Sequence, residues 1–100
     1  MNINITARKF KARETLKDYV KDEVKSLLKF NDDILRADVI LSFQNSHDSI
    51  KKAEITIHIP GQTFIAAEES DEFTKSVSAA VHKLLRQLKT LKSKRKSRVK

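Results

Sequence analysis

The basic side chains near the end of the chain carry the clearest chemical signal in this sequence. Residues 71–100 hold ten Lys and Arg against two acidic residues, whereas residues 1–70 hold eleven of each kind. The whole formal charge of +8 therefore lies in the last segment, and no acidic residue follows Glu72. A local excess of positive charge attracts polyanions, which makes nucleic acid the first candidate partner and an anionic membrane surface the second.

The spacing of these cations predicts that they share one face of a helix. At 100° per residue, the apolar side chains from Phe73 to Leu91 fall on one side. The opposite side holds Lys75, His82, Lys83, Arg86 and Lys89. A solvated helix surface usually mixes both signs of charge, and a face of like charges is costly unless a partner neutralises it. The pattern therefore favours contact with phosphates.

Residues for catalysis or metal binding are poorly arranged. His47, His58 and His82 fall on different predicted elements without metal-ligand spacing. The single glycine cannot build a phosphate-binding loop, and the lack of cysteine excludes disulfides and a Cys nucleophile. The adjacent acids Asp32 and Asp33 are typical of a turn after a helix. We therefore predict no enzyme activity, no metal site and no cofactor.

Aromatic residues for base stacking are scarce in this sequence. Four of the aromatic residues are expected in the core, namely Tyr19, Phe43, Phe64 and Phe73. Phe10 and Phe30 receive no assignment from the pattern. This distribution argues against a single-strand reader that stacks bases and favours a protein that recognises folded RNA by shape.

Hydrophobic periodicity predicts the elements that must position the cations. Alternation over residues 2–7 predicts a strand, and apolar residues spaced by three and four predict a helix over 14–30. A basic connection, residues 8–13, joins the two. Three further strands are predicted over 37–44, 53–59 and 62–68, with a polar, mobile loop over 45–49 and a turn at Pro60-Gly61. Ser70 is expected to cap the final helix, which runs to about Leu91.

These elements predict an α+β domain of order β-α-β-β-β-α. The first two strands should be parallel with a right-handed crossover, and the later strands should form an antiparallel meander. Both helices are expected to pack on one face of the four-stranded sheet. We expect a single binding domain over residues 1–92 and a basic, disordered tail over 93–100. With no signal-peptide pattern or long apolar stretch, the chain is predicted to be soluble and cytoplasmic.

Several short motifs resemble the ribosome hibernation promoting factors and the related ribosome-associated translation inhibitor. The resemblance spans roughly residues 3–94 and rests on the order and spacing of the motifs together. The motifs are Ile3-Asn4-Ile5-Thr6, Ala53-x-Ile55-x-Ile57 before Pro60-Gly61, Ala66-Ala67-Glu68, Ser70-Asp71-Glu72-Phe73 and Lys83-Leu84-x-Arg86-Gln87-Leu88.

This resemblance implies a fold like a double-stranded RNA-binding domain and docking on small-subunit rRNA in the decoding channel. Occupying that channel blocks tRNA and mRNA binding, inhibits translation and keeps idle ribosomes intact in stress or stationary phase. The implied partners are the small ribosomal subunit and the assembled ribosome, with no membrane and with a monomeric free protein. From the family positions and the helix face together, the expected RNA-binding residues are Arg8, Lys9, Lys25, Lys75, Lys83, Arg86, Lys89, Lys92 and Lys94.

The sequence departs from the family pattern at a few positions. Ser78 stands where the family often has an aspartate, which makes the final helix more cationic. On the first helix, the usual lysine positions fall on Glu23 and Ser26, and Lys25 and Lys29 are expected to substitute for them. The chain also ends before the extra domain by which long members dimerise ribosomes, so a short form is expected.

Two alternatives to a ribosome-binding factor remain at this stage. The first is a stand-alone protein that binds structured RNA outside the ribosome. The second is a protein whose basic amphipathic C-terminal helix lies on an anionic membrane or binds an acidic partner. A membrane-surface helix usually carries bulky interfacial aromatics, and this one has only Phe73 at its far end, so the membrane alternative is disfavoured.

Overall fold

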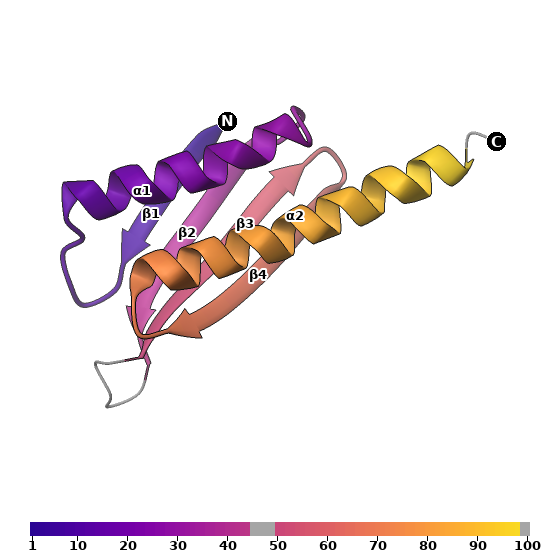
Figure 1. Ribbon diagram of the computed structural model, residues 1–100. Helices are drawn as coiled ribbons and strands as arrows, with labels where there is room; N and C mark the ends of the chain where they lie inside the picture. The colour runs from indigo at the N-terminus through magenta and orange to yellow at the C-terminus, as the bar shows by residue number, and fades with distance from the viewer. Residues whose placement is uncertain (45–49, 99–100) are drawn as a thin grey trace.

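The computed structural model describes the backbone of residues 1–44 and 50–98, and within those ranges the side chains up to residue 91. The elements are β1 (Asn2–Ala7), α1 (Glu14–Lys25), the 3-10 helix η1 (Ser26–Lys29), β2 (Arg36–Phe43), β3 (Lys51–Ile59), β4 (Gln62–Ser70) and α2 (Phe73–Arg98). Their order confirms the predicted β-α-β-β-β-α arrangement (Figure 1). The predicted mobile loop over 45–49 lies outside the described residues.

The four strands form one mixed sheet in the spatial order β1-β2-β3-β4. β1 pairs with β2 in parallel, with Ile5 opposite Val39. The two remaining pairings are antiparallel and place Ile55 of β3 between Val39 and Ala66 of β4. Because strand side chains alternate between faces, this register gathers the apolar side chains on one face of the sheet. The predicted parallel first pair and antiparallel meander are confirmed.

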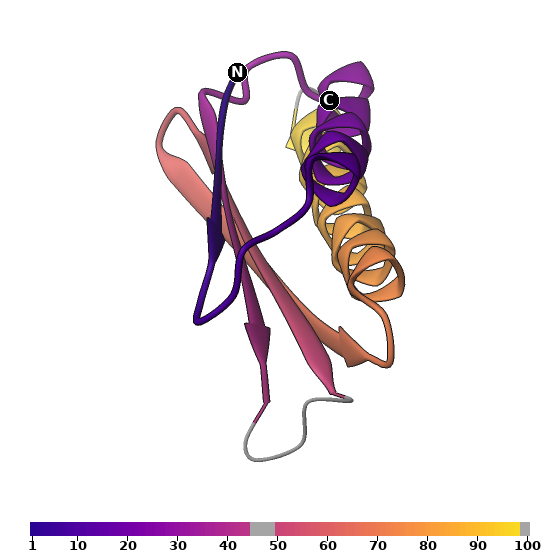
Figure 2. The same ribbon diagram turned by 90° about the vertical axis from the view of Figure 1, so that its left-hand side faces the viewer.

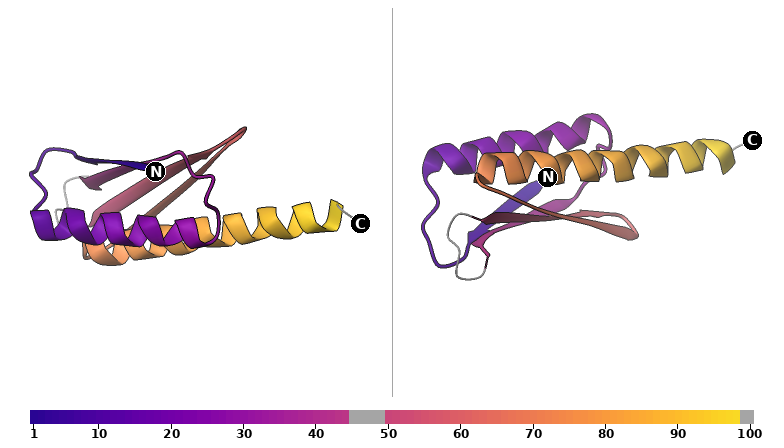
Figure 3. Two further views of the ribbon diagram at one scale, coloured as in Figure 1. Left: turned by 90° about the horizontal axis from the view of Figure 1, so that it is seen from above. Right: turned by 60° about the horizontal axis from the view of Figure 1, so that its bottom comes forward.

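Both helices cover the apolar face of the sheet, as predicted (Figure 2). Val20, Val24 and Leu27 in α1 and η1 are fully buried, as are Val77 and Leu84 in α2. Burying each such side chain contributes roughly 1.5–3 kcal/mol to the free energy of folding. The two helices lie side by side in one layer (Figure 3). This packing fixes which face of α2 points outward.

The first helix ends earlier than predicted. α1 stops at Lys25 and continues as η1, whereas the periodicity predicted a helix to Phe30. The Ser26 hydroxyl donates a hydrogen bond to the Glu23 carbonyl over 2.6 Å, the kind of local bond by which serine competes with regular helix geometry. The Phe30 N–H donates to the Leu27 carbonyl over 3.0 Å, an i→i+3 bond typical of a 3-10 turn.

The bounds of the final helix also differ from the prediction. Ser70 lies before the helix: its hydroxyl accepts the Glu72 N–H over 3.2 Å, while the Ser76 N–H donates to the Glu72 carbonyl over 3.1 Å. α2 extends to Arg98, beyond the end predicted near Leu91, because Lys and Arg are good helix formers and no Gly or Pro interrupts them. The disorder predicted for residues 93–100 and the domain end at residue 92 stay predictions.

The turn between β3 and β4 is built by Pro60-Gly61, as predicted. Gly61 has φ +80°, a left-handed conformation that glycine adopts without strain. Within the part of the chain that the structure describes, no helix combines the length and apolar character needed to cross a bilayer.

Candidate nucleic-acid interface

The outward face of α2 carries the predicted cationic surface. The helix is fixed in rotation because Val77, Leu84 and Leu88 are buried against the sheet and α1. The side chains on the opposite face are exposed to solvent, namely Lys75, His82, Lys83, Arg86 and Lys89. We call these five residues the α2 stripe. At 1.5 Å per residue it runs about 20 Å along the helix axis.

Two members of the α2 stripe are paired with acidic side chains. Lys75 Nζ lies 3.2 Å from Asp71 Oδ1 and 3.6 Å from Glu72 Oε2. The hydrogen bond to Asp71 and the charges of both acids raise the pKa of Lys75 above its ordinary value. Lys83 Nζ lies 2.6 Å from Glu68 Oε2 on β4. Such exposed pairs are weak, so a phosphate can replace either carboxylate as partner.

The remaining side chains of the α2 stripe have no acidic partner among the described residues. Arg86 and His82 are exposed and form no ion pair there. Lys89 Nζ instead lies 5.4 Å from the centroid of the Phe30 ring, at the end of η1. Arg86 is therefore the member best placed to bind an external anion, because its guanidinium presents several donors in a fixed fork.

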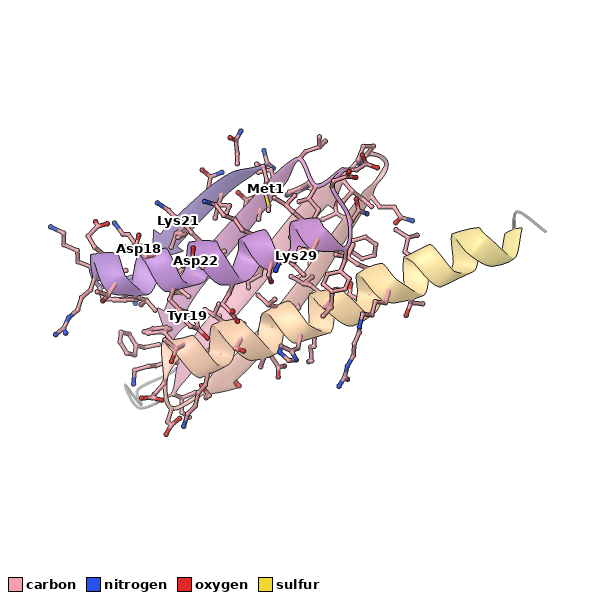
Figure 4. The ribbon with its side chains drawn as sticks, turned by 45° about the horizontal axis from the view of Figure 1, so that its top comes forward. Met1, Asp18, Tyr19, Lys21, Asp22 and Lys29 are labelled. Atoms are coloured by element: carbon pink, nitrogen blue, oxygen red, sulfur yellow. The ribbon has the colours of Figure 1, made fainter. Side chains whose placement is uncertain are left out.

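A hollow of about 590 Å³ lies beside the α2 stripe. Its lining combines basic, hydroxyl and acidic side chains, namely Tyr19, Glu68, Thr74, Lys75, Ser78, Ala79, His82, Lys83 and Arg86. Tyr19 enters it from the side of α1 that faces α2 (Figure 4). Hydroxyl groups beside cations are common donors to phosphate oxygens. An aspartate in place of Ser78 would put a negative charge in this hollow.

Sequence reasoning did not assign Tyr19, Thr74 or Ser78 to the site. Tyr19 was expected in the core, and it is only half-buried because its ring packs on the core while it lines the hollow. His82 was placed on the cationic face but was not counted among the RNA contacts. Helical spacing could have found Ser78, which lies one turn from Lys75 and His82, and Thr74, which precedes Lys75 and lies one turn from Ser78.

The basic connection after β1 is anchored to the start of α2. Phe10 stacks on Phe73 with ring centroids 5.0 Å apart, and Phe43 packs edge-on against both rings. Arg8 and Lys9, both exposed, precede this anchor directly. The Arg8 N–H donates to the Leu41 carbonyl over 2.9 Å, which extends the pairing of β1 with β2. The cluster thus holds the connection near the N-terminal end of the α2 stripe.

The other predicted contacts do not fall into one cluster. Lys25 is exposed in the last turn of α1, in the same helical layer as the α2 stripe. Lys92 and Lys94 continue α2, and their side chains lie outside the described residues. The described cations of α2, with Lys25 on the neighbouring helix, therefore extend along the helical layer. An extended track suits a nucleic-acid backbone better than a compact anion.

The surface of α1 differs from that of α2. Lys21 lies between Asp18 and Asp22 on the outer side of this helix (Figure 4). Lys17 Nζ lies 3.8 Å from Glu14 Oε1. Mixed charges of this kind are typical of a solvated helix face.

The uncovered face of the sheet is polar and also mixed in charge. Asp38 accepts hydrogen bonds from Asn4 over 3.0 Å and from Arg36 over 3.2 Å, and His58 Nε2 lies 3.2 Å from it. The hydrogen bond from Asn4 is the main cause that lowers the pKa of Asp38. Among the described residues, runs of positive charge without acidic residues thus lie on α2 and in the basic connection over 8–13. Within the described residues no group of His, Asp and Glu could hold a metal ion.

Comparison with known proteins gives consistent results. The family profile described as "Sigma 54 modulation protein / S30EA ribosomal protein" matches residues 3–96. A ribosome hibernation promoting factor from Pseudomonas putida is 30% identical over 97 residues, which cover 97% of this chain and 92% of that protein.

Two solved structures are also similar to this chain. A ribosomal subunit interface protein from Coxiella burnetii superposes with a TM-score of 0.84 at 25% identity, covering 93% of this chain and 99% of that one. The N-terminal domain of Protein Y from Thermus thermophilus gives a TM-score of 0.80 at 28% identity, with 91% and 99% covered. The fold class and the family predicted from the sequence are confirmed.

Proposed function

The chain belongs to the Sigma 54 modulation protein / S30EA ribosomal protein family, and from this premise we propose that it is a ribosome hibernation factor. In this proposal it binds the small ribosomal subunit and inhibits translation by occupying the decoding channel. The names of its relatives, a hibernation promoting factor and a subunit interface protein, support a ribosomal partner. A stand-alone binder of structured RNA is not favoured by these relatives.

The observation that carries the proposal is the one-sided charge of α2. The α2 stripe points outward over the helical layer, while α1 and the uncovered sheet face mix both signs. Ribosomal RNA offers a dense array of phosphates that can neutralise the stripe. The field of the stripe would also accelerate the encounter with so large a polyanion.

The mechanism is occupancy and requires no covalent step. The α2 stripe, with Arg8 and Lys9 at one end, contacts rRNA phosphates, and the rigid sheet holds these cations at fixed separations. The bound domain fills the space that tRNA and mRNA need, so initiation fails. The protein acts on the small subunit and on the assembled ribosome, as a monomer when free and within the cytoplasm. No active site or cofactor takes part.

Charge reversal on the α2 stripe tests this proposal. Lys83→Glu combined with Arg86→Glu lowers the net charge from +8 to +4. We expect roughly tenfold or greater loss of co-sedimentation with small subunits at about 0.1 M salt, because two phosphate contacts become repulsive. Binding of initiator tRNA to subunits should recover in parallel.

The matched control changes the same charge elsewhere. Lys21→Glu combined with Lys52→Glu also lowers the net charge to +4, but it alters the outer side of α1 and the uncovered sheet face. We expect this variant to bind like the wild type. Unchanged binding of Lys83→Glu with Arg86→Glu would contradict the proposed site. Equal competition by a simple RNA duplex would instead favour a stand-alone RNA binder.

A further inference from the structure

We propose that Phe30 is a stacking platform for an unpaired RNA base, placed at the far end of the α2 stripe. This inference rests on the proposed function and adds a base contact to a surface so far described only as binding phosphates. It concerns the hollow between the end of η1 and α2, which the sequence left without an assignment.

Phe30 is the exposed aromatic ring among the described residues. Its side chain is 40% exposed, whereas Phe10, Phe43 and Phe73 pack against one another. The hydrogen bond from its N–H to the Leu27 carbonyl fixes the backbone at the end of η1. A fixed ring open to solvent costs little entropy when a base stacks on it.

The Lys89 ammonium lies 5.4 Å from the Phe30 ring centroid, within the range of a cation–π contact. Lys89 also belongs to the α2 stripe, and the exposed Lys29 lines the same hollow as Phe30. A nucleotide stacked on Phe30 would therefore have cations near both of its flanking phosphates. The platform and the phosphate track share one residue, which makes them parts of one surface.

The hollow beside the ring has the size of a small ligand site. Its volume is about 310 Å³, at the lower end of known ligand pockets. Its lining is mainly polar with some apolar side chains, and is made by Leu28, Lys29, Phe30, Asn31, Asp32, Asp33, Leu88 and Leu91. The Asn31 side-chain oxygen accepts the Asp33 N–H over 2.8 Å, which shapes the rim of the hollow.

The acidic rim favours a base over other occupants. Asp32 and Asp33 are exposed carboxylates that repel a phosphate entering the hollow. The same carboxylates can accept hydrogen bonds from the amino group of a base, as acidic residues do with cytosine. An apolar peptide side chain offers no donor to this rim. The chemistry therefore points to an unpaired nucleotide with an amino edge, flanked by backbone that follows the α2 stripe.

Ribosome binding by Phe30 variants tests the platform. Phe30→Ala should weaken co-sedimentation with small subunits about 5- to 150-fold, the range found when stacked aromatics are truncated. Phe30→Leu should be similarly weak because it lacks a π-face, while Phe30→Tyr should bind like the wild type. Leu35→Ala is the control, since Leu35 is 59% exposed but lies outside the hollow. Wild-type binding by Phe30→Ala or Phe30→Leu would overturn the inference, the latter indicating an apolar protein contact.

A spectroscopic measurement tests the platform without the ribosome. The chain has no tryptophan, so Phe30→Trp introduces a unique reporter. We expect short oligoriboadenylate to quench the indole emission and to protect it from acrylamide, and inorganic polyphosphate of equal charge to do neither. Equal effects of the two polyanions would overturn stacking.

The two measurements separate this inference from the proposed function. If Lys83→Glu with Arg86→Glu loses ribosome binding but Phe30→Ala does not, the stacking platform fails and the hibernation function stands. If wild-type protein fails to bind small subunits while oligoriboadenylate still quenches the indole of the Phe30→Trp variant, the proposed function fails and the platform stands.

Discussion

Lys9 has a backbone conformation that is unfavourable for its residue type. Its φ is +64°, in the left-handed region that costs a non-glycine residue about 1–2 kcal/mol. The side chain is exposed in the basic connection, so packing does not explain the choice of lysine. The positive charge of Lys9 near the start of the α2 stripe explains the lysine, because the connection is proposed to contact RNA.

Lys9→Gly should therefore separate stability from binding. Glycine relieves the strain but adds entropy to the unfolded chain, so the free energy of unfolding should rise by up to about 1 kcal/mol. Ribosome binding should weaken, because one phosphate contact is lost. Urea unfolding and co-sedimentation measure the two effects.

Lys9→Ala is the control for this pair of effects. It removes the charge and keeps the strain, so it should weaken binding equally without raising the free energy of unfolding. If Lys9→Gly destabilises the fold, the backbone strain inferred for this residue is absent.

Contacts between individual side chains are the part of the site that could not be predicted from the sequence. Lys83 and Arg86 share one face by helical spacing, and the structure exposes both. That Lys83 meets Glu68 depends on how α2 crosses β4, which no local pattern encodes. The exposure of Phe30 likewise depends on η1 replacing the last turn of α1.

At the scale of elements, α2 is tied to the sheet by one buried hydroxyl. Ser76 is fully buried, and its Oγ donates to the Lys51 carbonyl over 2.7 Å. The same oxygen lies 2.7 Å from Ser70 Oγ. These bonds link the first turn of α2 to both strands of the second hairpin, and so set the position of the α2 stripe relative to the sheet.

Ser76→Ala should loosen this attachment. We expect a loss of about 1–3 kcal/mol in the free energy of unfolding, because buried polar groups lose a partner in a dry environment. Urea denaturation of the variant measures the loss. Ser78→Ala, on the half-exposed side of the same helix, should change stability by less than about 0.5 kcal/mol. Equal effects of the two substitutions would contradict the role given to Ser76.

The helices and strands themselves were largely predictable because two hydrophobic periods dominate this sequence, the alternation of strands and the three-to-four spacing of helices. Alternation in Ile55, Ile57 and Ile59 indicates a strand with one buried face, and the structure buries all three. The burial of Ser76 was not predictable in this way, because a serine within an apolar arc has no hydrophobic signal. Its burial depends on a hydrogen-bond acceptor from a distant strand.

At the scale of the whole molecule, charge is separated between surfaces. The α2 stripe contains no acidic side chain, while α1 and the uncovered sheet face carry both signs. The molecule measures 51 × 22 × 19 Å, and its long dimension follows from α2 projecting beyond the sheet (Figure 1). An elongated body with one cationic edge fits a groove walled by phosphates better than a flat surface.

Salt dependence of ribosome binding should report this separation. Each phosphate contact contributes about −0.7 to −0.9 to the slope of log affinity against log salt concentration, because bound counterions are released. Replacing Lys83 and Arg86 by glutamine should make the slope less negative by about 1.4 to 1.8, whereas the same change at Lys21 and Lys52 should leave it unaltered. Co-sedimentation over a series of potassium concentrations gives both slopes.

A slope that responds equally to the two pairs would mean that net charge, and not the α2 stripe, governs binding. A wild-type slope near zero would mean that contacts other than phosphates hold the protein on the subunit.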